Sequence, residues 1–246
     1  MLVLAPHPDD EAIGCGGTVL RHVATGDHVV LAIVTDGRRS GGMRDPDGMA
    51  AIRLGEARGA AAVLQAGLDW LGLPEGDWSV EQLRDSLMAR LEQLRPDVVY
   101  APSRVDFHPE HHKVAHALAL ALEAVSHRPE VLRVYQVQVP LTRQLVNVVS
   151  DLSSVLAPSE AALRKHRSQA GTIASIFRRR RYSAKWHALP TAAEEFWEMP
   201  VQRYVELHRA PPAQWHDHYR GIRAFSFTDP LAWLVGRKAR RRLNPD

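Results

Sequence analysis

The sequence contains a single cysteine, Cys15, among its 246 residues. One thiol excludes an internal disulfide, and it also excludes a zinc site built from several thiolates. A metal site in this chain must therefore use histidine and carboxylate side chains. The residues around Cys15 place no base beside it, so we expect a packed and inert thiol rather than a nucleophile.

The sequence also lacks a long apolar run. No stretch is long enough to span a bilayer, because a spanning helix needs about 20 consecutive apolar residues. Met1 leads directly into the apolar residues 2–5, without a basic region or a small-residue cleavage site. From these two absences we expect a soluble, cytoplasmic protein.

There is little excess charge of either sign, since 31 Lys and Arg against 28 Asp and Glu give a net charge of +3. This small excess, an aromatic content of 7% and the lack of a nucleic-acid-binding motif argue against a nucleic-acid partner. The positive charge gathers in residues 177–186 (FRRRRYSAKW) and 236–243 (GRKARRRL). We expect solvated faces there. The alternative is that they bind an anionic part of the substrate or a lipid headgroup, with residues 229–243 as an interfacial helix.

Short apolar runs alternate with helical patterns over the first 130 residues. The predicted strands are 2–5, 28–35, 68–71 and 97–101, and the predicted helices are 17–25, 47–66, 79–95 and 111–125. This alternation predicts an α/β protein with a mostly parallel, doubly wound sheet and helices on both faces. Beyond residue 130 the pattern is weaker, with strands expected at 131–139 and 145–151 and a helix at 158–169.

Polar clusters follow three of the predicted strands. They are HPDDE (7–11), TDG (35–37) and SRVDFHPEHH (103–112). In open α/β sheets ligands bind beyond the carboxyl ends of the strands, so we expect the clusters to form one site. Asp36 is expected to line that site, with a plain strand-end turn as the alternative.

The first and third clusters contain the donors of a catalytic metal site. Such a site takes about three nitrogen or oxygen ligands and keeps one position for water. His7, Asp10 and one later histidine would supply a His-Asp-His set. Adjacent turn residues point in different directions, so Asp9 could face the water as a general base. Spacing leaves His111 and His112 as alternatives for the third ligand.

Both N-terminal motifs also have structural interpretations. HPDDE (7–11) could be an Asp-rich turn that caps a helix, and Glu11 is expected at the helix start or behind a ligand. The glycines of GCGGT (14–18) do not complete a dinucleotide fingerprint, because its third glycine would fall on Val19. We expect these glycines to let the backbone approach the metal loop closely.

APHPDDE followed by GCGGT, together with DFHPEHH at residues 106–112, resembles the PIG-L/LmbE family of zinc-dependent deacetylases. IRLGEARGAA, ALRKHRSQ and AEEFW resemble further segments of that family. The resemblance implies a Rossmann-like deacetylase domain over residues 1–200, with an extension over 201–246 that packs on it and ends in a basic amphipathic segment. It also implies hydrolysis of an N-acetyl group, commonly on an N-acetylglucosamine moiety.

The resemblance further implies the ligands and the base. His7, Asp10 and His111 match the zinc ligands of the family, and Asp9 matches its general base. Imidazole and carboxylate ligands also accept Fe²⁺, Co²⁺ or Mn²⁺. The implied reaction is hydrolysis of an amide by metal-activated water, which yields acetate and a free amine.

Three more roles come from the same resemblance. His108 matches the histidine that stabilises the oxyanion or protonates the leaving amine. Some relatives carry a tyrosine two residues earlier, where this chain has Asp106, which we expect to orient His108 by a hydrogen bond. Arg53 matches a substrate-contacting arginine, and its alternative is a surface residue paired with Glu56 or Asp47.

The sequence therefore predicts a zinc-dependent N-deacetylase of a small amino-sugar or glycoconjugate substrate. One alternative keeps the same site but cleaves a non-sugar or thiol-conjugate amide. Another, from a different class, is a basic non-enzymatic protein that binds anionic lipid or nucleic acid, with peripheral membrane contact in the first case.

Overall fold

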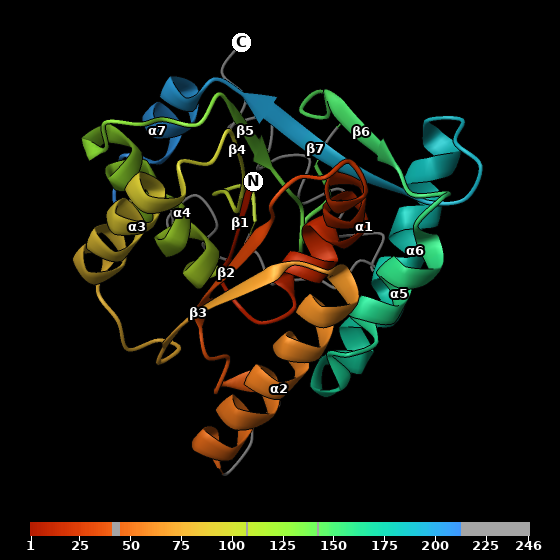
Figure 1. Ribbon diagram of the computed structural model, residues 1–246, viewed down its shortest axis with the longest axis horizontal. Coiled ribbons are helices and arrows are strands. Elements are labelled where there is room, and N and C mark those ends of the chain that lie inside the picture. Colours follow the sequence, from red (N-terminus) through yellow and green to blue (C-terminus); the bar gives the residue numbers. More distant parts are fainter. Residues whose placement is uncertain (41–44, 107, 142, 213–246) are drawn as a thin grey trace, which may run out of the picture. The chain divides into compact units, whose positions relative to one another are not determined.

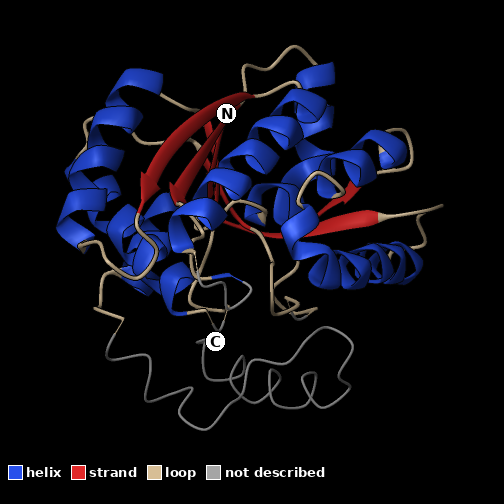
Figure 2. Cartoon of the chain, turned by 90° about the horizontal axis from the view of Figure 1, so that it is seen from below, coloured by secondary structure: helices blue, strands red, loops and turns tan. Residues whose placement is uncertain are grey.

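The computed structural model of the chain describes residues 1–40, 45–106, 108–141 and 143–212. Its strands are β1 (Leu2–Ala5), β2 (Val30–Thr35), β3 (Gly67–Leu73), β4 (Val98–Ala101), β5 (Val131–Val134), β6 (Val148–Asp151) and β7 (Ala193–Met199). They form a sheet in the order β3-β2-β1-β4-β5-β7-β6, with helices around it (Figure 2). The predicted α/β class with a mostly parallel sheet is confirmed.

The described helices alternate with the strands from β1 to β5, and further along the chain strands β5 and β6 and helices α5 and α6 follow each other (Figure 1). They are α1 (Asp10–Ala24), α2 (Pro46–Leu64), α3 (Val80–Leu94), α4 (Pro109–Ala124), α5 (Leu156–Leu163), α6 (Ala170–Trp186) and α7 (Val201–His208). A short 3₁₀ helix covers Arg167–Gln169. Among the described residues, none of these helices combines the length and apolarity that crossing a membrane requires.

The chain divides into two compact units. Among the described residues, the first unit contains 1–78 and 149–194, and the second contains 79–148 and 195–212. The predicted interfacial helix at 229–243 and the basic segment at 236–243 lie outside the described residues.

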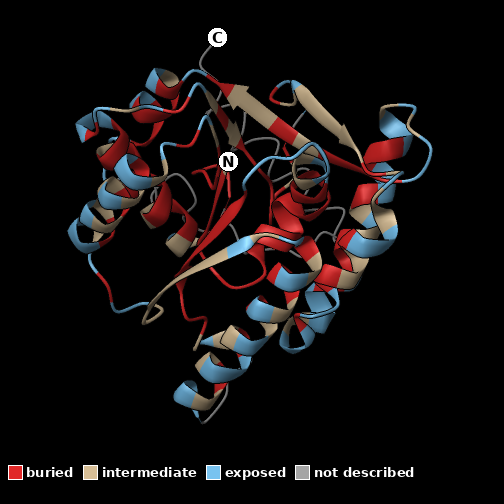
Figure 3. Ribbon diagram, viewed as in Figure 1, coloured by how far each residue is buried: buried red, intermediate tan, exposed pale blue. Residues whose placement is uncertain are grey.

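In the first unit, β1 and β2 are parallel and buried along their whole length (Figure 3). Their continuous apolar sequence explains this burial, because a parallel strand covered on both faces has no polar side. β3 pairs in parallel with β2 and is longer than predicted, at residues 67–73 instead of 68–71. α5 packs against α1 and α2.

The first helix begins seven residues earlier than predicted, at Asp10 instead of residue 17. Asp9 turns the chain directly from the strand end into the helix with a φ of 147°, and its carbonyl accepts the N–H groups of Ala12 and Ile13. The GCGGT glycines therefore lie inside α1. A Cβ on Gly17 would overlap the side chain of Leu152, so this glycine provides close packing within the first unit.

The predicted solvated face of residues 177–186 is wrong for one arginine. Arg180 of α6 is only 1% exposed, and its guanidinium pairs with Glu194 and donates to the carbonyl of Ala12. Glu194 also accepts the backbone N–H groups of Gly17 and Thr18. A buried ion pair with these additional hydrogen bonds joins α6 to the N-terminal half of α1.

In the second unit, β4 and β5 are parallel, and β5 pairs antiparallel with β7. β7 was not predicted, because its sequence AEEFWEM carries three glutamates. One of these, Glu198, accepts a hydrogen bond of 2.8 Å from Nε of Arg133 on β5. The cross-strand ion pair accounts for a charged residue in a strand that lies between two others.

Candidate functional site

The turn after β1 carries His7 and Asp10 in direct contact. The backbone N–H of His7 donates to Oδ2 of Asp10 at 2.9 Å, and Nδ1 of the ring lies 3.2 Å from the same oxygen. Both side chains are buried. Nε2 of His7 lies 3.6 Å from Oε1 of Glu75, a residue that the sequence analysis did not single out. Glu75 follows β3, so its position beyond a parallel strand was the signal that could have revealed it.

Asp9 lies beside a buried arginine. Its Oδ2 is 3.3 Å from Nη2 of Arg53 on α2, and the same nitrogen donates to the carbonyl of Pro8. Arg53 is 3% exposed, so its alternative as a surface residue is wrong. Burial raises the pKa of Asp9 to about 6, although the charge of Arg53 opposes this shift. A carboxylate whose pKa lies this close to neutrality is suited to accepting a proton.

Glu11 lies behind Asp9 and contacts a second residue that sequence reasoning missed. Its Oε1 is 2.9 Å from Nε2 of His166, and both side chains are fully buried. Burial lowers the pKa of His166, but the Glu11 carboxylate outweighs it, so the net pKa is raised. The signal that could have revealed His166 is its place in ALRKHRSQ, a segment that resembles the family, although a histidine between two basic residues is also typical of a solvated segment.

Both carboxylate oxygens of Asp36 accept hydrogen bonds from residues close to it. Its Oδ1 accepts the backbone N–H groups of Arg38 and Glu75, each at 3.1 Å, and its Oδ2 accepts Nε of Arg38 at 2.6 Å. These contacts favour the strand-end turn, the alternative to lining the site, and they hold the loop that carries Glu75.

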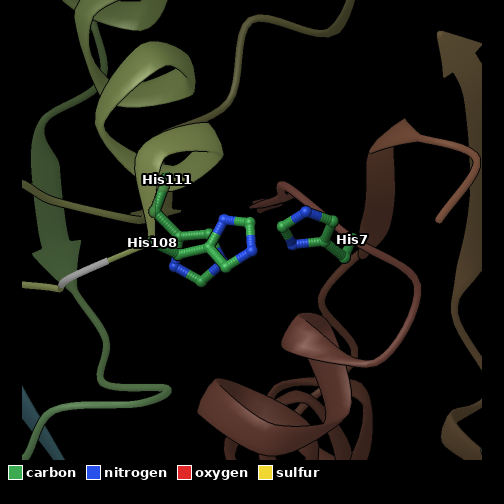
Figure 4. Close-up of side chains that lie close together, drawn as sticks. All are labelled: His7, His108 and His111. Atoms are coloured by element: carbon green, nitrogen blue, oxygen red, sulfur yellow. The ribbon is translucent and has the colours of Figure 1, made fainter. Parts of the chain in front are cut away.

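The second cluster is organised by the start of α4. His108 is the N-cap, and Nδ1 of its ring accepts the backbone N–H of Glu110 at 3.3 Å. His111 lies in the first turn, and the two ring centroids are 5.1 Å apart (Figure 4). Oδ2 of Asp106 lies 3.2 Å from Nδ1 of His111.

Contacts of the loop before α4 bear on whether His111 or His112 is the third metal ligand. Nε2 of His112 contacts the backbone carbonyl of Asp106, so this ring is used within the second unit. Ligand atoms of His7, His108 and His111 lie within 4.8 Å of one another, the one such group among the described residues that could hold a metal ion. Asp10 is not part of that group, and its Oδ2 lies 3.2 Å from Nδ1 of His7.

The loop before α4 is also anchored by α7. Nε2 of His208 accepts the backbone N–H of Arg104 at 3.2 Å, and its Nδ1 donates to the carbonyl of Tyr204 at 2.8 Å. Nδ1 of His116 donates to the carbonyl of His208 at 2.7 Å. Burial lowers the pKa of His208 from 6.5 to about 3. The ring is therefore neutral at pH 7 and accepts a backbone hydrogen bond that protonation would remove.

This lowered pKa predicts an acid-sensitive contribution to folding. Between pH 6.5 and about 3 the unfolded chain binds a proton at His208 that the folded chain does not, so stability falls as the pH falls through this window. The slope from one group is at most about 1.4 kcal/mol per pH unit. Urea unfolding from pH 7 to 4 should show a shallower loss for His208→Gln than for the unaltered protein. Equal slopes would contradict the assignment.

The chain is an α/β protein that carries buried histidine and carboxylate side chains in the turn after β1 and near the start of α4. The family described as "PIG-L: GlcNAc-PI de-N-acetylase" matches residues 2–122. A Bacillus cereus relative, "Probable N-acetyl-alpha-D-glucosaminyl L-malate deacetylase 2", is 30% identical over 218 residues, which cover 80% of this chain and 96% of the relative. The chain belongs to the PIG-L family, as the sequence motifs predicted.

Other similar proteins cover less of their own length or share only the fold. The Saccharopolyspora erythraea "1D-myo-inositol 2-acetamido-2-deoxy-alpha-D-glucopyranoside deacetylase 1" is 29% identical over 175 residues, and the match covers 55% of this chain and 56% of that protein. The solved structure of the Pyrococcus horikoshii N,N'-diacetylchitobiose deacetylase matches this chain with a TM-score of 0.72 at 22% identity, and the match covers 82% of this chain and 84% of that chain. The latter likeness supports the fold.

Proposed function

We propose that this protein is a metal-dependent N-deacetylase that removes an acetyl group from an amino-sugar conjugate. The observation that carries the proposal is the grouping of His7, His108 and His111 in a member of a de-N-acetylase family. The relatives named above are deacetylases of acetylated glucosamine conjugates, which supports this substrate class.

The donor set fits a divalent ion. In the proposed site His7, Asp10 and His111 hold the ion, with Zn²⁺ as the preferred metal and Fe²⁺, Co²⁺ or Mn²⁺ as alternatives. Nδ1 of His111 lies beside the carboxylate of Asp106, which is not a proposed ligand, and this arrangement leaves Nε2 of the His111 ring for the ion. When bound, such an ion lowers the pKa of its water to about 7 and polarises a carbonyl group.

His108 is suited to a different task. Because its Nδ1 accepts the Glu110 N–H, the neutral ring carries its hydrogen on Nε2 and presents a donor rather than a lone pair. In this tautomer the Nε2–H can donate a hydrogen bond to the oxyanion, which supports that part of the proposed role. To give a proton to the leaving nitrogen His108 acts as the imidazolium, which also carries a proton on Nδ1 and therefore releases the Glu110 N–H.

The remaining residues complete the hydrolysis. Asp9 accepts a proton from the attacking water, whose oxygen forms a bond to the acetyl carbon. The C–N bond then breaks, the nitrogen takes a proton from His108, and the products are acetate and an amine. Arg53, next to Asp9, holds that carboxylate in place and favours its charged form. Arg53 would thus support the proposed base, in addition to the substrate contact that we propose for it.

The test is a substrate screen with two readouts. Glucosaminyl conjugates of inositol and malate, diacetylchitobiose and a thiol-conjugate amide are each incubated with the zinc-loaded protein. We expect equimolar acetate and primary amine from at least one acetylated sugar, and no release after treatment with a chelator. Cleavage of the thiol conjugate alone would replace the sugar substrate, and no cleavage by metal-loaded protein would contradict the enzyme assignment.

A further inference from the structure

A buried chain of contacts leads from the segment after α5 to the backbone of Asp9. Nε2 of His166 lies 2.9 Å from Oε1 of Glu11, and the other oxygen of Glu11 accepts the backbone N–H of Asp9 at 2.9 Å. His166 is 0% exposed and Glu11 1%. Each carboxylate oxygen of Glu11 therefore has its own partner inside the first unit.

Asp9 needs such support because of its backbone conformation. Its φ of 147° and ψ of −27° lie in a region that residues with a Cβ rarely adopt, and its side chain makes no capping hydrogen bond to α1. Conformations of this kind persist only where the surroundings impose them. The hydrogen bond from its N–H to Glu11 is one such constraint, and the ion pair with Arg53 is another.

His166 is itself held firmly. Its backbone N–H donates to the carbonyl of Leu163 at the end of α5, and its carbonyl accepts the N–H of Gln169. Two residues later, Ser168 donates its N–H and its hydroxyl to Glu56 on α2, at 2.8 and 2.7 Å. Glu56 lies one helical turn from Arg53, so both supports of Asp9 are fixed to the same helix.

We propose that Glu11 and His166 are positioning residues that hold the backbone of Asp9 so that its carboxylate is presented for proton transfer. This inference rests on the proposed function, in which Asp9 is the base. Neither residue touches the substrate. Their removal should therefore act on the step that uses Asp9, lowering kcat more than it changes KM.

The first test needs neither metal nor turnover. In the metal-free protein, His166→Leu removes the hydrogen-bond donor to Glu11, and we expect the Asp9 amide to exchange its hydrogen about tenfold faster or more. His166→Gln restores a donor and should restore most of the protection. Ser159→Ala is the matched control, because Ser159 is equally buried on the adjacent α5 and contacts the carbonyl of Leu156 instead.

The second test is kinetic and uses the same variants loaded with zinc. For His166→Leu we expect kcat to fall about 10- to 100-fold with KM changed less than about twofold, with recovery in His166→Gln. Metal content should be unchanged. If His166→Leu does not fold, Glu11→Gln serves the same purpose, because it weakens the contact with His166 while keeping the shape of the side chain.

The outcomes separate the positioning role from the proposed function. An unaltered protein that releases no acetate refutes the function, while the exchange of the Asp9 amide still decides whether His166 holds that backbone. Unchanged exchange in His166→Leu, unchanged kcat in an active enzyme, or equal losses in Ser159→Ala would each overturn the positioning role.

Discussion

Replacing Asp9 by asparagine is expected to lower kcat by about 10²- to 10⁴-fold, the usual contribution of a general base. The amide keeps the size of the carboxylate but cannot accept the proton of the attacking water. Asp9 is not a proposed metal ligand, so the metal content should stay at one ion per chain. Steady-state kinetics, with metal analysis of the same sample, provide the measurement.

The same substitution has a second consequence, which serves as its control. Arg53 loses the charge of a carboxylate 3.3 Å away, and a buried cation without its partner is costly. We therefore expect a lower unfolding temperature for Asp9→Asn, and circular dichroism must show that the assayed protein is folded. A folded, metal-loaded variant that retains more than half of the original kcat would contradict the role of Asp9 as base.

Loss of a metal ligand should lower activity about as much as loss of the proposed base does. We expect His111→Ala to lose most of its bound zinc and nearly all activity, because a three-ligand site that loses one ligand binds its ion far more weakly. Plasma mass spectrometry after dialysis measures the metal-to-protein ratio. The Asp106 carboxylate, 3.2 Å from Nδ1 of His111, would then be left without that imidazole.

His112→Ala is the matched control for this prediction. Both histidines lie in the first turn of α4 and both are buried, but the ring of His112 contacts the Asp106 carbonyl. We expect this variant to keep its zinc. The reverse result, with zinc retained in His111→Ala and lost in His112→Ala, would show that the wrong histidine was assigned.

Elements with a strong periodic pattern were predictable from the sequence to within a residue or two. α3 begins at Val80 because Ser79 accepts the Gln82 N–H, and its leucines at 83, 87 and 91 are all buried. β1 and β2 were recognisable as continuous apolar runs. In both cases the local pattern and the burial required by the fold agree.

Elements that depend on distant contacts could not be predicted. The charge of Glu194 in β7 is accommodated by Arg180, 14 residues earlier, and by the N–H groups of α1. The early start of α1 depends on the unusual φ of Asp9, which no propensity favours. In each case tertiary contacts outweigh local preference.

The candidate site was likewise predictable only in part from the sequence. Motifs identified the histidines and aspartates of both clusters, since their residue types already indicate metal and acid–base chemistry. Glu75 and His166 were missed because each acts through a partner far away in the sequence, His7 and Glu11 respectively. The pairing of Asp106 with His111 required the geometry of the helix start.

The central claim is that one divalent ion is held jointly by His7 and Asp10 after β1 and by His111 at the start of α4. A crystal of the zinc-loaded protein, measured at the zinc absorption edge, tests it directly. The account predicts one strong anomalous peak within about 2.0–2.2 Å of a nitrogen of His7, a nitrogen of His111 and an oxygen of Asp10. A peak bound by other residues, or no peak at these side chains in an active enzyme, would contradict it.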